Sequence, residues 1–201
     1  MKQLIQSFSY IFHPLWMPLI GVSTYFLVTP RYVSHPFLYA KLFAVIIMTI
    51  IIPILSYSMF KNLGLVKSIH LHTTKERIYP LIFQIIFILM LINIVFEGYE
   101  FPEIHYFFVG ILGSVIAVLF LLFAKFKTSI HMVGVSGVLL FVIGLSIHFN
   151  KNLLLLIAFF AFACGATATS RLDAKAHTSQ ELIIGFIIGA LPQLLTYTYW
   201  L

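Results

Sequence analysis

The chain alternates between long apolar runs and short connections that hold most of its polar residues. Six runs reach or approach the roughly 20 apolar residues that a helix needs to cross the hydrocarbon core of a bilayer. A seventh apolar segment, residues 4–28, is long enough to span but contains His13, Pro14 and Pro18. It either crosses the membrane or lies kinked at the interface. We predict a membrane-spanning helix in each of the other six runs: residues 42–60, 78–96, 106–124, 130–149, 153–170 and 182–201.

Composition indicates the same class of protein. Hydrophobic residues make up 61% of the 201 residues, charged residues make up 9%, and the mean hydropathy is +1.06. Such a chain cannot cover a water-facing surface with polar groups. We therefore expect an all-α, polytopic membrane helix bundle of six or seven helices, built as one domain over residues 1–201. In this domain residues 1–28 form an N-terminal hydrophobic segment and residues 42–201 a six-helix catalytic bundle.

Three connections carry most of the charge. They follow the runs at 42–60, 106–124 and 153–170, and two apolar runs separate each from the next, so all three emerge on one face of the membrane. The other face balances three basic residues (Arg31, Lys41, Lys151) against three acidic ones (Glu97, Glu100, Glu103). A one-sided basic excess either marks cytoplasmic loops or binds an anion. The three connections contain Lys61, Lys67, Lys75, Glu76, Arg77, Lys125, Lys127, Arg171, Asp173, Lys175 and Glu181.

The basic residues stand beside His and Ser in three clusters. The first, KERIYP from residue 75, has Arg77 just ahead of Pro80, and proline suits the first turn of a helix. The second, KTSIHMVGVSG from residue 127, opens the run that begins near residue 130. Thr128 or Ser129 can cap this helix, which leaves its first amides free to face an anion.

The third cluster is SRLDAKAHTSQE, residues 170–181. His177 and Glu181 have the i, i+4 spacing of neighbours on one helix face. A carboxylate there can hold one imidazole N–H and leave the other nitrogen as a base or nucleophile. His13, His35, His105 and His148 are isolated from the three clusters and are given no role.

The third cluster resembles a motif of the type 2 phosphatidic acid phosphatase superfamily, which also includes the vanadium haloperoxidases. That motif is Ser-Arg-x5-His-x3-Asp. Ser170, Arg171, His177 and Glu181 match it, with Glu in place of Asp.

The family's other two motifs are matched less closely. The second is Pro-Ser-Gly-His, of which Ser129 and His131 keep the Ser-x-His spacing while Thr128 and Ile130 stand at the Pro and Gly positions. The first contains a Lys and an Arg-Pro. Here Arg77 is followed by proline only at position 80, and either Lys75 or Lys67 takes the place of the lysine.

The resemblance covers residues 67–189 and implies hydrolysis of a phosphate ester through a phosphohistidine, with neither a metal ion nor another cofactor. By this analogy His177 attacks phosphorus, Glu181 orients it and His131 protonates the leaving oxygen. The phosphoryl oxygens are held by Lys75, Arg77, Lys127, Ser129 and Arg171. Because these residues lie at helix ends near headgroup depth, a lipid phosphate is the expected substrate: phosphatidic acid, phosphatidylglycerol phosphate or a polyprenyl pyrophosphate. Membrane lipids are the expected surroundings, and no nucleic-acid partner is expected.

Three other interpretations remain open. Gly134-Val-Ser-Gly137 matches the Gly-x-Ser-Gly of rhomboid intramembrane proteases, which makes Ser136 a candidate nucleophile. His70, His72, His131 and His177 could ligate a metal ion, since imidazole is a common ligand. The same pocket could also belong to a non-catalytic transporter of a lipid or an anion.

The orientation depends on residues 4–28. If this segment spans, the N-terminus shares the face of the three clusters, and the basic excess places that face in the cytoplasm. If it does not span, the site faces outward. We expect a bacterial inner membrane protein with an extracytoplasmic site.

Overall fold

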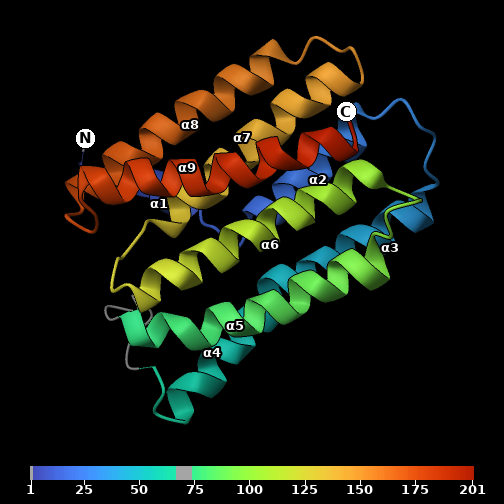
Figure 1. The fold of residues 1–201 in the computed structure, drawn as a ribbon. Coiled ribbons are helices and arrows are strands. Elements are labelled where there is room, and N and C mark those ends of the chain that lie inside the picture. The colour runs from blue at the N-terminus through green and yellow to red at the C-terminus, as the bar shows by residue number, and fades with distance from the viewer. Residues whose placement is uncertain (1, 67–73) are drawn as a thin grey trace.

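The computed structural model describes residues 2–66 and 74–201, and all regular secondary structure in these residues is helical (Figure 1). Six helical stretches are long and apolar enough to cross a membrane: His35–Asn62, Glu76–Val95, Pro102–Phe123, Ile130–His148, Leu154–Asp173 and Ser179–Tyr199. The prediction of a polytopic membrane helix bundle is therefore confirmed. The helices are α1 (Lys2–Ile11), α2 (Met17–Val28), α3 (His35–Ile46), α4 (Ile52–Asn62), α5 (Thr74–Met90), α6 (Pro102–Phe123), α7 (Ile130–His148), α8 (Leu154–Asp173) and α9 (Ser179–Thr196). Two π-helical turns, η1 (Ile47–Ile51) and η2 (Leu91–Val95), join α3 to α4 and extend α5, and a 3-10 turn, η3 (Tyr197–Tyr199), follows α9.

Three of the predicted spans begin a full helical turn or more too late, one of them α6, which starts at Pro102 rather than at residue 106. The first starts at His35 rather than at residue 42, because the charge of Lys41 is satisfied inside the bundle: its Nζ donates to the Val95 carbonyl and lies 3.1 Å from a Glu100 carboxylate oxygen. The helix that contains Pro80 starts at Thr74, so Pro80 lies in the helix interior and not in its first turn. A glutamate in the first turn, Glu76, favours this earlier start because it faces the positive end of the helix dipole.

The N-terminal segment is a broken pair of helices. α1 and α2 are separated at Phe12–Trp16, where Pro14 interrupts the chain. The two ends of the segment lie at opposite ends of α8 (Figure 1). The Ser9 hydroxyl is 2.6 Å from that of Ser170 in the last turn of α8, and Lys151, just before α8, donates to the Val28 carbonyl. Residues 2–28 therefore extend from one end of the bundle to the other.

α7 is the most buried of the six spans and packs against α2, α8 and α9. The approach of α9 depends on glycine. A Cβ at Gly189 would collide with the Val133 carbonyl and the Ser136 hydroxyl, and one at Gly185 would lie 2.8 Å from the Ser129 carbonyl oxygen. These contacts fix α9 against the start of α7, and so fix the second cluster against the third.

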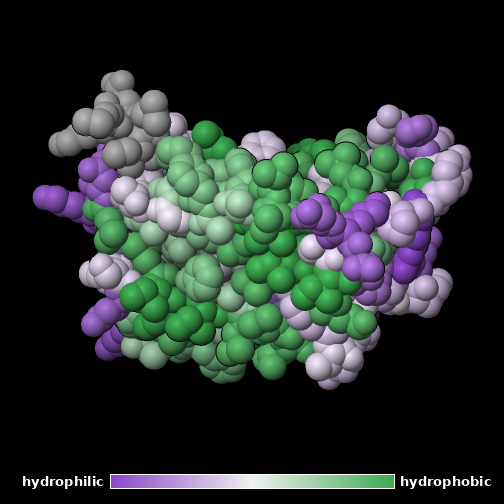
Figure 2. Space-filling view, turned by 90° about the horizontal axis from the view of Figure 1, so that it is seen from above, coloured by the Kyte–Doolittle hydropathy of each residue, from purple (hydrophilic) through white to green (hydrophobic). Residues whose placement is uncertain are grey.

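The outer surface matches a bilayer. In Figure 2 apolar residues cover the middle of the molecule, and hydrophilic residues gather toward its two ends. Large apolar side chains such as Leu55, Phe120 and Phe162 are more than half exposed. Such exposure is costly in water and favourable in hydrocarbon.

Candidate functional site

Residues of all three clusters meet at one end of the bundle. Arg77 stands on α5, Lys127 in the connection before α7, and Arg171 in the last turn of α8. A guanidinium nitrogen of Arg77 donates to the Thr128 carbonyl at 3.3 Å, and Lys127 Nζ donates to the Ala176 carbonyl at 3.4 Å. The three connections do share one face, as their parity predicted.

His177 and Glu181 form a hydrogen-bonded pair. The His177 Nδ1 atom is 2.7 Å from a Glu181 carboxylate oxygen, and the His177 side chain is only 3% exposed. The two residues do not share a helix as the i, i+4 spacing suggested, because α8 ends at Asp173 and α9 begins at Ser179. The contact arises instead at the N-terminus of α9.

A capping box, which was not predicted from the sequence, holds Glu181 in this position. Thr178 is the N-cap of α9, and its hydroxyl accepts the Glu181 amide at 3.3 Å. The Glu181 carboxylate accepts the Thr178 amide at 3.2 Å through the same oxygen that faces His177. The signal was present as Thr-x-x-Glu ahead of an apolar run.

His177 and Lys127 lie outside the spans, and each has a lowered pKa. Burial lowers the pKa of His177 from 6.5 to about 4, against the opposing effect of the Glu181 hydrogen bond, and Arg171 lowers it further. His177 is thus a neutral imidazole at physiological pH. Because Nδ1 is joined to a carboxylate, the proton lies on Nδ1 and Nε2 carries the free lone pair. Burial, and then Arg77, lower the pKa of Lys127.

The second cluster is tied to the start of α9. The Ser129 amide and the Thr128 hydroxyl both donate to the Glu181 carbonyl, at 3.3 and 3.2 Å. Ser129 is the N-cap residue of α7, but its side chain does not bond the helix amides, so the predicted side-chain cap is wrong. Ser129 is fully buried and lies behind the cavity wall rather than on it. Within the described part of the chain its hydroxyl and Arg171 Nε are buried without a hydrogen-bond partner.

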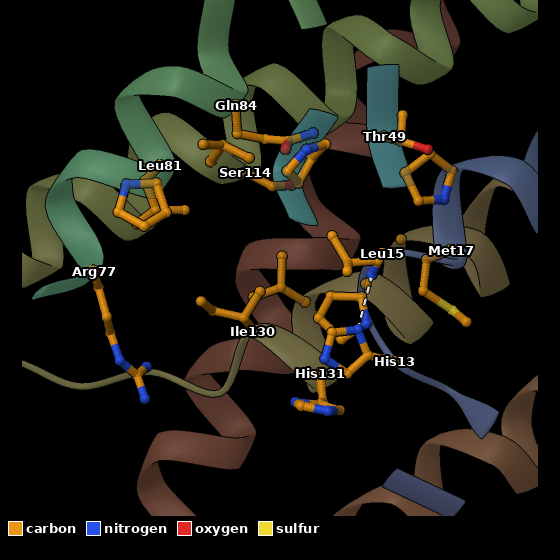
Figure 3. A pocket seen from close by; sticks show the side chains of 18 of the residues that line it. His13, Leu15, Met17, Thr49, Arg77, Leu81, Gln84, Ser114, Ile130 and His131 are labelled. Atoms are coloured by element: carbon orange, nitrogen blue, oxygen red, sulfur yellow. Dashed lines mark hydrogen bonds between the residues drawn. The ribbon is translucent and has the colours of Figure 1, made fainter. Parts of the chain in front are cut away.

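The cluster residues border a cavity of about 970 Å³. Arg77, Lys127, His131, Arg171 and His177 line its charged end. Away from these residues the lining is mainly apolar and aromatic, and it includes Leu81, Phe83, Phe87, Phe107, Ile111 and Val138. Figure 3 shows Arg77 extending from α5 at one edge of this space and His131 from α7 at another.

His13 joins the site although it lies outside all three sequence clusters. The His13 ring lies 5.2 Å from the His131 ring, centroid to centroid, at an interplanar angle of 84°, and both rings line the cavity (Figure 3). Ser9 and Tyr10 of α1 line it as well. In the sequence His13 is isolated from the three clusters, so their pattern does not include it. The available signal was a histidine next to a proline within an otherwise apolar segment.

Other candidates lie elsewhere. Lys67, His70 and His72 fall outside the described residues, and so does the side chain of Lys75. Ser136 is fully buried between α7 and α9, donates to the Phe186 carbonyl at 3.0 Å and does not line the cavity. Among the described residues no group of three or more His, Cys, Asp or Glu side chains is arranged to hold a metal ion.

A second charged cluster lies at the opposite end of the bundle. The buried carboxylate of Glu103 is 2.8 Å from an Arg31 guanidinium nitrogen and 3.0 Å from His148 Nε2, and it accepts the Tyr25 hydroxyl at 3.3 Å. Arg31, His148 and Tyr25 all pair with the Glu103 carboxylate, so we interpret this cluster as structural. His148 therefore has a structural contact, although its sequence position, isolated from the three clusters, indicated no role.

Comparison with known proteins finds no match to a family model, to a curated protein or to a solved structure.

Proposed function

We propose that the protein is a membrane phosphatase that hydrolyses a lipid phosphate or pyrophosphate through a phosphohistidine intermediate. The observation that carries this proposal is the His177–Glu181 pair at the edge of the cavity. Glu181 occupies Nδ1 and leaves Nε2 as the nucleophilic nitrogen. Arg77, Lys127 and Arg171 line the same end of the cavity and supply cations for the phosphoryl oxygens.

The first step is attack by His177 Nε2 on phosphorus. A P–N bond forms, the P–O bond to the leaving group breaks, and the leaving oxygen receives a proton from His131. Glu181 stabilises the positive charge that develops on the His177 ring. Uncatalysed phosphate monoester hydrolysis is so slow that enzymes accelerate it by up to about 10²¹-fold, and fixed cations around the transferred group supply much of such an effect.

The second step is hydrolysis of the phosphohistidine. Water attacks phosphorus, its proton passes to the now neutral His131, and the P–N bond breaks with the electron pair returning to Nε2. Inorganic phosphate leaves, and both histidines regain their starting states. One histidine therefore serves as acid and then as base.

The apolar part of the cavity supports a lipid substrate. The charged end of the cavity lies level with the ends of the helices, and its apolar lining lies within the membrane-spanning segments. A phosphate headgroup at His177 would leave its hydrocarbon chain among side chains such as Phe83 and Phe87. Phosphatidic acid, phosphatidylglycerol phosphate and polyprenyl pyrophosphate all fit this description.

The broken helix pair bears on orientation. Residues 2–28 extend across the bundle as two short helices, although only six helices in the described chain are long enough for a full crossing; we propose that this pair counts as a crossing and that the N-terminal residues lie at the site end. By sequence the site end has nine Lys and Arg residues and the opposite end three. We therefore propose a bacterial inner membrane protein whose site faces the cytoplasm. Labelling of single cysteines in intact cells tests this: Lys175→Cys should be protected and Tyr99→Cys labelled, and the reverse pattern would establish an outward site.

The function is tested by phosphate release from these three lipids in detergent, with EDTA or vanadate added. Release should resist EDTA, fall with vanadate and be lost in His177→Ala. Ser136→Ala is the matched control, because Ser136 does not line the cavity. If the folded wild type releases no phosphate but binds the lipids, the non-catalytic transporter is the better description. Loss of a proteolytic activity in Ser136→Ala would establish the rhomboid alternative.

A further inference from the structure

The break between α1 and α2 forms one wall of the cavity, and the proposed chemistry gives it no task. Ser9, Tyr10 and His13 line the cavity from this side. His13 is the residue whose ring meets that of His131, the proposed acid.

A backbone contact favours one protonation state of His13. The Leu15 amide donates to His13 Nδ1 at 3.3 Å, as the dashed line in Figure 3 indicates. Nδ1 is therefore the acceptor, and the single ring proton lies on Nε2. A second proton would have to sit on Nδ1, where it would face the amide hydrogen. The contact thus favours neutral His13.

The packing around the break is close. A Cβ at Gly134 would lie 2.9 Å from Met17 Cγ and 3.6 Å from Pro14 Cα. Gly134 follows His131 by three residues on α7, so the break and His131 share one helix face. At the other side, the Ser9–Ser170 contact fastens α1 to α8 beside Arg171. The position of the His13 ring is therefore determined by two neighbouring helices.

We propose that His13 is a positioning residue that acts through His131, an inference that rests on the proposed function. The Leu15 amide favours neutral His13, so His13 takes no part in the proton transfers. When the P–O bond breaks, a proton passes from His131 to the leaving oxygen, and His131 later takes the proton from the attacking water. His13 keeps its own proton throughout and holds the His131 ring in place.

Other ionisable groups also surround the pair. Arg171 of α8 interacts electrostatically with both His13 and His131. His177, which precedes α9, also interacts electrostatically with His131. Tyr10 of α1 and Lys175 after α8 line the same cavity. All of them remain in a His13 variant, so a change caused by the variant belongs to the imidazole pair.

The experiment compares an ester that needs an acid with one that does not. Phosphatidic acid has a poor alkoxide leaving group, whereas 4-nitrophenyl phosphate has a good one. His13→Phe keeps a ring but removes both nitrogens, and His13→Asn keeps an acceptor for the Leu15 amide but removes the ring. His35→Phe is the matched control, because His35 is exposed at the opposite end of the bundle. General acids contribute about 10²–10⁴-fold, so we expect kcat for phosphatidic acid to fall about 10-fold or more in both His13 variants and kcat for the aryl ester to fall far less.

A second readout needs no turnover. In protein labelled at histidine, the NMR titration midpoint of His131 should differ between wild type and His13→Phe, and it should be unchanged in His35→Phe. Equal losses on both esters, or an unchanged His131 titration, would overturn the role of His13. If the wild type hydrolyses neither ester, the proposed function fails, and the titration still decides whether His13 governs the protonation of His131.

Discussion

Glu181 has two roles that a pair of substitutions can separate. Its carboxylate orients His177 at 2.7 Å and also accepts the Thr178 amide in the capping box. Glutamine at this position preserves a capping box but replaces the carboxylate charge and can present an N–H to Nδ1, which would leave His177 in the wrong tautomer. Removing the carboxylate that orients a catalytic histidine costs about 10⁴-fold in serine hydrolases. We expect Glu181→Gln to lower kcat by about 10²–10⁴-fold with little change in thermal stability.

Thr178→Ala should do the opposite. It removes the hydroxyl that accepts the Glu181 amide but leaves the carboxylate beside His177. Loss of an N-cap side chain costs about 1 kcal/mol, which corresponds to a melting temperature lower by about 2–4 °C in a chain of this size. Phosphate release and thermal unfolding, measured on the same detergent-solubilised samples, give both quantities. If Glu181→Gln unfolds at a lower temperature and retains full kcat, Glu181 is a helix cap and the nucleophile assignment loses its support.

Three further predictions follow from the same contacts. Because burial lowers the pKa of His177 to about 4, the nucleophile stays neutral between pH 6.5 and 4, and the acid limb of kcat/KM should fall near pH 4; a limb at pH 6.5 would contradict the burial of this imidazole. Gly189→Ala should destabilise the protein by about 1–3 kcal/mol through overpacking against Val133. At Gly165 a Cβ meets nothing within 4 Å, so Gly165→Ala should stabilise the protein by about 0.5–1 kcal/mol. Thermal unfolding compares the two variants, and equal effects would refute the packing argument. Ser136→Ala should lose about 1 kcal/mol of stability with its buried hydrogen bond and keep its kcat, as unfolding and phosphate release on one sample will establish.

The sequence predicted the fold well because a membrane imposes a simple requirement. Each crossing needs about 20 apolar residues with their backbone groups paired, and each of the six predicted runs overlaps most of one spanning helix. The boundaries failed where a polar residue finds a partner far along the chain. Lys41 lies inside the first span in this way, because the Val95 carbonyl and the Glu100 carboxylate accept hydrogen bonds from its ammonium group. No local pattern reveals such a partner.

The same distinction between local patterns and distant partners separates the site residues that were predicted from the one that was not. Parity along the chain was enough to bring Arg77, Lys127 and Arg171 to one end of the bundle. The contact between His177 and Glu181 was expected from their spacing, although a capping box rather than a shared helix produces it. His13 could not be found in this way, because its place beside His131 depends on a helix break whose direction is set by tertiary packing.

The contact of Ser9 with Ser170 joins residues 161 positions apart, and this has a consequence for biosynthesis. A ribosome delivers α1 to the membrane first, and α8 emerges only after most of the chain has been inserted. The N-terminal wall of the cavity must therefore wait through nearly the whole of translation before its partner helix arrives. A nascent chain released before α8 would contain α1, the break and His131, and would nevertheless lack a closed cavity.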